Sequence, residues 1–246
     1  MRGFEESTLW RISEFERVRR ETGSSGFLSF GASMLSSTLL ADLHRIEDWR
    51  SGEYDIVEVL AASLRHREAV LLLLRYEELV WPVTVFPLHM QCHSPRDLAA
   101  APPQGLATLA VLAVEPPGVR VPGHWMHERV GAAAHYRPLL PLLWRLALHG
   151  PRWQLLADIG GTAAYRIVPS PHGALPAGGG ALVPAMERLR RESASLREIA
   201  HWPGMGLERA SRLLNALYLA SALLMTRSHP AARREPRPLF GSRRGR

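Results

Sequence analysis

The amino-acid sequence predicts an α+β protein, in which a small antiparallel sheet with helices is followed by a small helical C-terminal domain. Three observations lead to this prediction. Apolar residues recur at helical spacing in three segments before residue 68, and they then run almost continuously through residues 68–75 and 79–91. A stretch rich in Pro, Gly and Ala at 169–182 precedes a second region of helical spacing.

The three early segments each predict an amphipathic helix. In residues 6–21 an apolar residue recurs every third position, and residues 33–49 place five apolar side chains on one side. Residues 55–67 begin with Asp55, and Glu58 follows three positions later, which is a pattern like that of a capping box.

The next segments predict the sheet. Residues 68–75 and 79–91 form two strands, and residues 106–116 form a third. Pro82 and Pro87 lie in the second strand. Because proline cannot donate a hydrogen bond to a neighbouring strand, we expect this strand to lie at a sheet edge or to contain a bulge. Further along, the sequence predicts a helix that ends at Gly150-Pro151, a short helix at 153–158 and a strand at 163–168.

The sequence divides into four parts. We expect an α+β domain at 1–168, a linker at 169–182, a helical domain at 183–226 and a disordered tail at 227–246. Residues 1–180 hold 17 Arg and 18 acidic residues, whereas the last 20 residues hold 7 Arg and one acid. The net charge of +7 therefore comes mainly from the tail. Such a tail can bind phosphates or anionic lipid nonspecifically, although a solubilising role is the simpler interpretation.

Composition favours a cytoplasmic protein that is not inserted in a membrane. The hydrophobic content of 46% suits a globular core, and the longest apolar runs, 69–74 and 109–114, are far shorter than a membrane span. The N-terminus has acidic residues where a signal peptide is apolar. Cys92 has no second cysteine to pair with. All 30 basic residues are Arg, which fits a bacterial genome of high GC content.

The C-terminal region carries a resemblance to known DNA-binding modules. A helix at 183–192, a short helix that begins with the capping box Ser195–Glu198, a turn containing HWPGMG and a helix at 207–225 follow in order. This order resembles bacterial helix-turn-helix and winged-helix modules, and the resemblance covers residues 183–230. It implies DNA recognition by the last helix. The side chains suited to that role are Arg197, Arg209, Ser211, Arg212 and Asn215.

The same helix is almost wholly apolar from Ala216 onward, which favours contact with protein instead. On that interpretation Leu217 and Tyr218 contribute to a protein interface. Trp125, in the loop segment PPGVRVPGHWMHERV, is a second candidate for partner contact. The partner is then another protein or a second copy of the chain in a homodimer.

The histidine and cysteine residues raise the question of a metal or thiol site. The candidates are His89, Cys92, His93, His124 and His127. Their spacing matches no standard zinc pattern, and consecutive strand residues point to opposite faces, so we expect Cys92 and His93 to diverge. The sequence also lacks a Walker A motif and a GxSxG elbow. We therefore predict no catalytic residues, no metal and no cofactor.

These observations give three hypotheses. The first is a non-catalytic bacterial regulatory or adaptor protein that acts through protein–protein contacts. The alternative is a transcriptional regulator that binds DNA through residues 195–215. The third, and least favoured, is a metal- or thiol-dependent enzyme centred on His89, Cys92, His124 and His127.

Overall fold

The computed structural model describes residues 9–22, 34–49 and 54–232. The expected starts of the first two helices, and residues 233–246 of the expected tail, lie outside the described residues. Mixed helices and antiparallel sheets confirm the predicted α+β class. In the part of the chain that is described, no helix is long and apolar enough to span a bilayer.

The larger sheet is antiparallel, with strand order β5-β2-β3-β4-β6. Its strands are β2 (Val70–Tyr76), β3 (Leu79–Phe86), β4 (Gln91–His93), β5 (Ala110–Glu115) and β6 (Tyr136–Pro138). The short β1 (Trp10–Arg11) also pairs with β3. The β2–β5 pairing shifts in register between Leu73 and Leu74.

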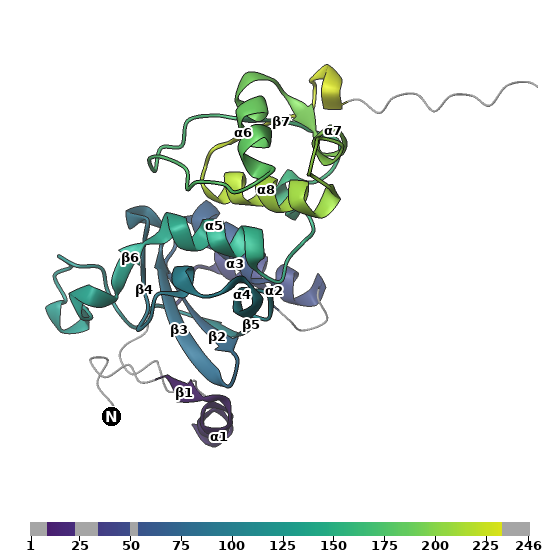
Figure 1. Ribbon diagram of the computed structural model, residues 1–246. Coiled ribbons are helices and arrows are strands. Elements are labelled where there is room, and N and C mark those ends of the chain that lie inside the picture. Colours follow the sequence, from purple (N-terminus) through teal and green to yellow (C-terminus); the bar gives the residue numbers. More distant parts are fainter. Residues whose placement is uncertain (1–8, 23–33, 50–53, 233–246) are drawn as a thin grey trace, which may run out of the picture.

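Helices cover both faces of this sheet. The side chains of α2 (Ser37–Trp49), α3 (Ile56–His66) and α5 (Leu139–His149) share a core with Leu72 and Leu74 of β2. Phe15 of α1 (Ile12–Thr22) packs instead with Leu71 and Leu73. Because consecutive strand residues face opposite sides of a sheet, α1 covers the face away from α3 and α5 (Figure 1).

The strand predicted at 79–91 is wrong as a single element. Pro87–His89 forms a 3₁₀ turn, and Met90 has a φ of 47°, so the chain reverses and β4 pairs back onto β3. The strand also does not lie at the edge of the sheet, because β3 has neighbouring strands on both sides. On the side of β3 away from β2, residues 79–80 pair with β1 and residues 84–86 with β4. Pro82 falls between these two paired segments, where a missing N–H breaks no described ladder.

A second sheet joins residues from both sides of the predicted linker. β7 (Ala164–Ile167) lies between β8 (Ala194–Ser195) and β9 (Leu223–Thr226), and both pairings are antiparallel. The predicted boundary at residue 168 therefore separates β7 from the two strands with which it pairs. The linker itself leads from β7 to α6.

The C-terminal helices follow the predicted order. They are α6 (Leu182–Arg191), α7 (Leu196–Ala200) and α8 (Leu207–Leu219). The capping box between Ser195 and Glu198 at the start of α7 is confirmed. The prediction that the last helix continues to Met225 is wrong, because Ser221 has a φ of 53° and the chain then enters β9. The short helix predicted at 153–158 is a 3₁₀ turn, Ala157–Ile159.

The two sheets are joined by a helix pair. α8 packs along α5, so that α5 lies between the larger sheet and the C-terminal helices (Figure 1). One cluster of buried apolar side chains runs from α2 through α5 to α8. The short α4 (Pro103–Ala107) lies beside α5 at the edge of this junction.

Candidate functional site

The histidine and cysteine candidates lie in separate environments. His89 is in the 3₁₀ turn after β3, Cys92 and His93 are in β4, and His124 and His127 are in the loop before β6. Within residues 9–22, 34–49 and 54–232, no three His, Cys, Asp or Glu side chains gather as metal ligands. Burial raises the pKa of the Cys92 thiol to about 11, so the thiol is protonated at neutral pH.

His93 is enclosed by its neighbours. Its ring lies against His135 and Tyr136, with ring centroids 5.6 and 4.8 Å away. A Cβ at Gly131 would lie 2.5 Å from the His93 Nε2 atom, so the backbone of Gly131 covers that nitrogen. Burial, followed by the charges of His135 and Arg137, lowers the pKa of His93 to about 4. The imidazole is neutral and leaves no room for a ligand at Nε2.

The residues proposed for DNA recognition are divided between the interior and the surface. Asn215 is 0% exposed; its Nδ2 donates to the Gln154 carbonyl and its Oδ1 accepts from the Leu156 N–H, each at 2.9 Å. Ser211 is 3% exposed. In this arrangement of α8 neither side chain can reach a base edge.

The arginines of the same set also differ. Arg212 forms an ion pair with Glu208 at 2.9 Å and donates to the Gly150 carbonyl at 2.8 Å. Arg197 and Arg209 are exposed. The five residues that the sequence suggested for DNA recognition therefore lie in three different environments. Two are buried, one is held in an ion pair, and two are exposed.

The two apolar candidates on α8 face the interior. Leu217 is fully buried in the shared core. Tyr218 is half-buried, and its hydroxyl donates to Asp158 at 3.0 Å. Burial and the Asp158 carboxylate raise the pKa of Tyr218 to about 12. Both side chains hold α8 against the rest of the chain.

Trp125 lies at the surface, in a loop with extensive internal hydrogen bonding. Its side chain is 76% exposed, and its ring stacks on His124 at 5.7 Å between centroids. The His124 ring also accepts a hydrogen bond from the Met126 N–H. At the base of the loop, the Tyr136 hydroxyl donates to the Arg120 carbonyl and accepts from a backbone N–H at 2.9 Å. The exposed tryptophan is therefore carried by a loop whose backbone is held by hydrogen bonds.

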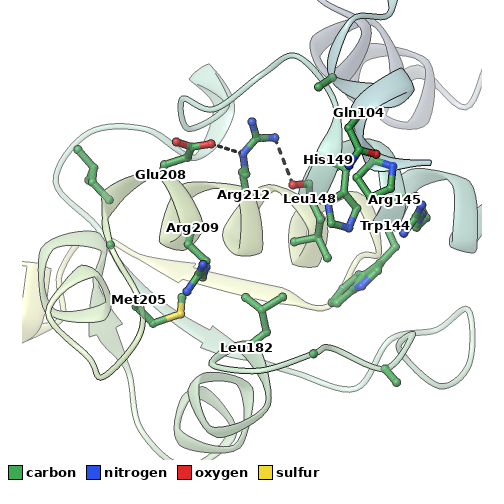
Figure 2. A pocket seen from close by; sticks show the side chains of 16 residues that line it. Gln104, Trp144, Arg145, Leu148, His149, Leu182, Met205, Glu208, Arg209 and Arg212 are labelled. Atoms are coloured by element: carbon green, nitrogen blue, oxygen red, sulfur yellow. Dashed lines mark hydrogen bonds and ion pairs between the residues drawn. The ribbon is translucent and has the colours of Figure 1, made fainter. Parts of the chain in front are cut away.

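An open cleft of about 980 Å³ lies at the junction of α4, α5 and α8 (Figure 2). Ala177, Gly179 and Leu182, in the segment that leads into α6, also line the cleft. Apolar side chains line part of the cleft: Trp144, Leu148, Leu182, Met205 and Leu207. Basic side chains line another part: Arg145, His149, Arg209 and Arg212.

The cleft carries an excess of positive charge. Of the described residues that line the cleft, Glu208 is the only acidic one, and it is paired with Arg212. Among the described residues, neither Arg145 nor Arg209 forms an ion pair. Burial and then the charges of Arg145 and Arg212 lower the pKa of His149, which therefore contributes little positive charge at neutral pH.

Comparisons with known proteins add no relative. No family model, curated protein or solved structure matches the chain.

The sequence does not predict the cleft, because the walls of the cleft come from distant segments. Trp144 and Arg145 lie in the helix that ends at Gly150, and Arg209 and Arg212 lie some 60 positions later. One local signal was present, because Arg145 interrupts the otherwise apolar run LLPLLWRLAL. A charged residue within an apolar run marks the side of the helix that does not pack in the core.

Proposed function

We propose that this chain is a non-catalytic regulatory or adaptor protein that acts through protein contacts, with Trp125 as the anchor of its contact surface. The observation that carries the proposal is the 76% exposure of Trp125 within a loop held at its base by Tyr136. Tryptophan is enriched among the residues that dominate binding energy at protein interfaces.

The hydrogen-bonded structure of the loop supports a role of Trp125 in partner contact. An interface side chain on an ordered loop loses less conformational entropy on binding than one on a flexible segment. The indole stacks on the His124 ring and still remains largely exposed. An exposed indole on a fixed loop is suited to entering an apolar pocket of a partner, where the burial of its large surface stabilises the complex.

The test is affinity capture from the native host with the full-length chain. The variant is Trp125→Ala, and Trp153→Ala is the matched control, because Trp153 is also exposed, at 50%, but belongs to the segment between α5 and β7. We expect one protein to be captured by the wild type and by Trp153→Ala and lost with Trp125→Ala. Equal capture of that partner by all three chains would refute the role of Trp125.

A further inference from the structure

We propose that the cleft between α5 and α8 binds a small amphipathic organic anion. Such a ligand has an apolar aromatic or aliphatic body and one carboxylate, sulfonate or phosphate group. This proposal does not depend on the proposed role of Trp125, because Trp125 lies in the loop before β6 and does not line the cleft.

The size and the apolar wall of the cleft suit the body of the ligand. A volume of about 980 Å³ is at the upper end of the range of small-molecule sites. Trp144 and Leu148 of α5 form one apolar surface, and Leu182 and Met205 form another. In Figure 2 these side chains surround the same open space. A flat or chain-like apolar body can displace water from both surfaces.

The charges around the cleft suit an anionic group. Arg209, Arg212 and Arg145 are arranged around the open space (Figure 2). Arg212 is neutralised by Glu208 and held by the carbonyls of Leu148 and Gly150, so it forms a fixed part of the wall. Arg145 and Arg209 retain uncompensated charge, because neither has a carboxylate partner among the described residues.

These two arginines also retain hydrogen-bond donors. Arg209 is exposed and gives one hydrogen bond, from Nη1 to the Gly204 carbonyl. Arg145 donates from Nη2 to the Ala101 carbonyl at 2.6 Å, while its Nε is buried and finds no acceptor among the residues that the structure describes. A guanidinium has five N–H donors and binds carboxylate or phosphate through two of them at once.

A separate observation comes from Trp144. Its side chain lines the cleft and is only 3% exposed, and its Nε1–H has no acceptor in the described part of the chain. Unpaired donors are uncommon in protein interiors. Both unpaired atoms, the Nε1 of Trp144 and the Nε of Arg145, are covered by protein atoms and are not open to the cleft in this conformation. The oxygens of an anion are acceptors only, so the uncompensated charge and free guanidinium donors of Arg145 and Arg209 favour an anion over a cation or a neutral donor.

The probe for the experiment is 8-anilinonaphthalene-1-sulfonate, which combines an aromatic body with one sulfonate and fluoresces when it leaves water. The full-length chain is titrated as wild type, as Arg209→Gln, as Arg145→Gln/Arg209→Gln, and as Arg197→Gln. Arg197 is the matched control because it is exposed on α7 and does not line the cleft. We expect saturable binding whose Kd rises about tenfold in the double variant and is unchanged in Arg197→Gln.

Three further measurements keep the result interpretable. N-phenyl-1-naphthylamine, the uncharged counterpart, should bind the double variant as it binds the wild type. Decanoate should displace the bound sulfonate, whereas decanol and acetate should not. Thermal melting identifies any unfolding in the double variant, and Arg209→Gln, at an exposed position, then serves as the deciding variant. An equal Kd for the sulfonate in wild type and cleft variants, or displacement by acetate alone, would overturn the proposal.

Discussion

The guanidinium of Arg152 and the carboxylate of Asp55 form an ion pair of 2.7 Å between Nη1 and Oδ2, in which the two side chains are 4% and 2% exposed. The other oxygen of Asp55 accepts hydrogen bonds from the N–H groups of Val57 and Glu58 at the start of α3. Arg152 also pairs with Glu58 at 2.9 Å and donates to two backbone carbonyls. One aspartate thus fixes both the start of a core helix and the segment that follows α5.

Replacement of Asp55 should therefore destabilise the fold strongly. Asp55→Ala removes the helix cap and leaves Arg152 with less compensation in the interior, and we expect a loss of about 3–5 kcal/mol in the free energy of unfolding. Asp55→Asn should lose less, because the amide oxygen can still cap α3. Urea denaturation followed by circular dichroism measures both variants. A loss below about 1 kcal/mol for Asp55→Ala would contradict a structural role for the pair.

We expect the Asn215 side chain to stabilise the folded chain. Asn215→Ala leaves the Leu156 N–H and the Gln154 carbonyl without their partner, and we expect a loss of about 2–4 kcal/mol in the free energy of unfolding. The comparison variant is Arg197→Ala, which is exposed and should change stability by less than about 0.5 kcal/mol. If Asn215→Ala left the melting temperature unchanged but weakened binding to duplex DNA, the alternative of DNA recognition by α8 would gain support.

Local signals account for the parts of this fold that the sequence predicted well. The cap at Asp55 and the capping box at Ser195 each depend on residues within three positions of one another. The end of α8 was missed for the opposite reason. Residues 220–225 continue an apolar pattern, and the chain leaves the helix because β9 pairs with β7, which lies more than 50 positions earlier. A local sequence pattern does not indicate a strand pairing between segments that are so far apart in the chain.

The same reasoning explains the outcome for the candidate sites. Strand alternation predicted that Cys92 and His93 would diverge, because that rule is local. The burial of Asn215 depends on the segment after α5, which no helical periodicity within α8 indicates. The cleft depends on the packing of α5 against α8. The position of the loop that carries Trp125 depends on the hydrogen bond of Tyr136 at the base of that loop.

The buried histidine should make stability depend on pH. In the folded chain the pKa of His93 is about 4, below the ordinary value of 6.5, so between these values the unfolded chain binds more protons. The stability that depends on neutral His93 is complete above pH 6.5 and is lost as the pH falls toward 4. Between pH 7.5 and pH 5 we expect this group alone to lower the free energy of unfolding by about 2 kcal/mol.

The measurement is urea denaturation of the wild type and His93→Leu at both pH values. Other titrating groups contribute to both chains, so the informative quantity is the difference between the two pH dependences. The leucine variant should show a shallower decline on acidification by about 2 kcal/mol. Parallel declines would show that His93 titrates at its ordinary pKa in the folded chain.

The position of β7 has a consequence for any attempt to divide this protein. β7 precedes the segment rich in Pro, Gly and Ala, yet it is the central strand between β8 and β9. A fragment that begins at residue 183 would leave the inner edges of two strands without their hydrogen-bond partners, and such edges promote aggregation. A single protease cut within 171–180, in contrast, severs no strand. The two pieces would stay together through the β7 ladders and the contact of α5 with α8, and would separate only in denaturant.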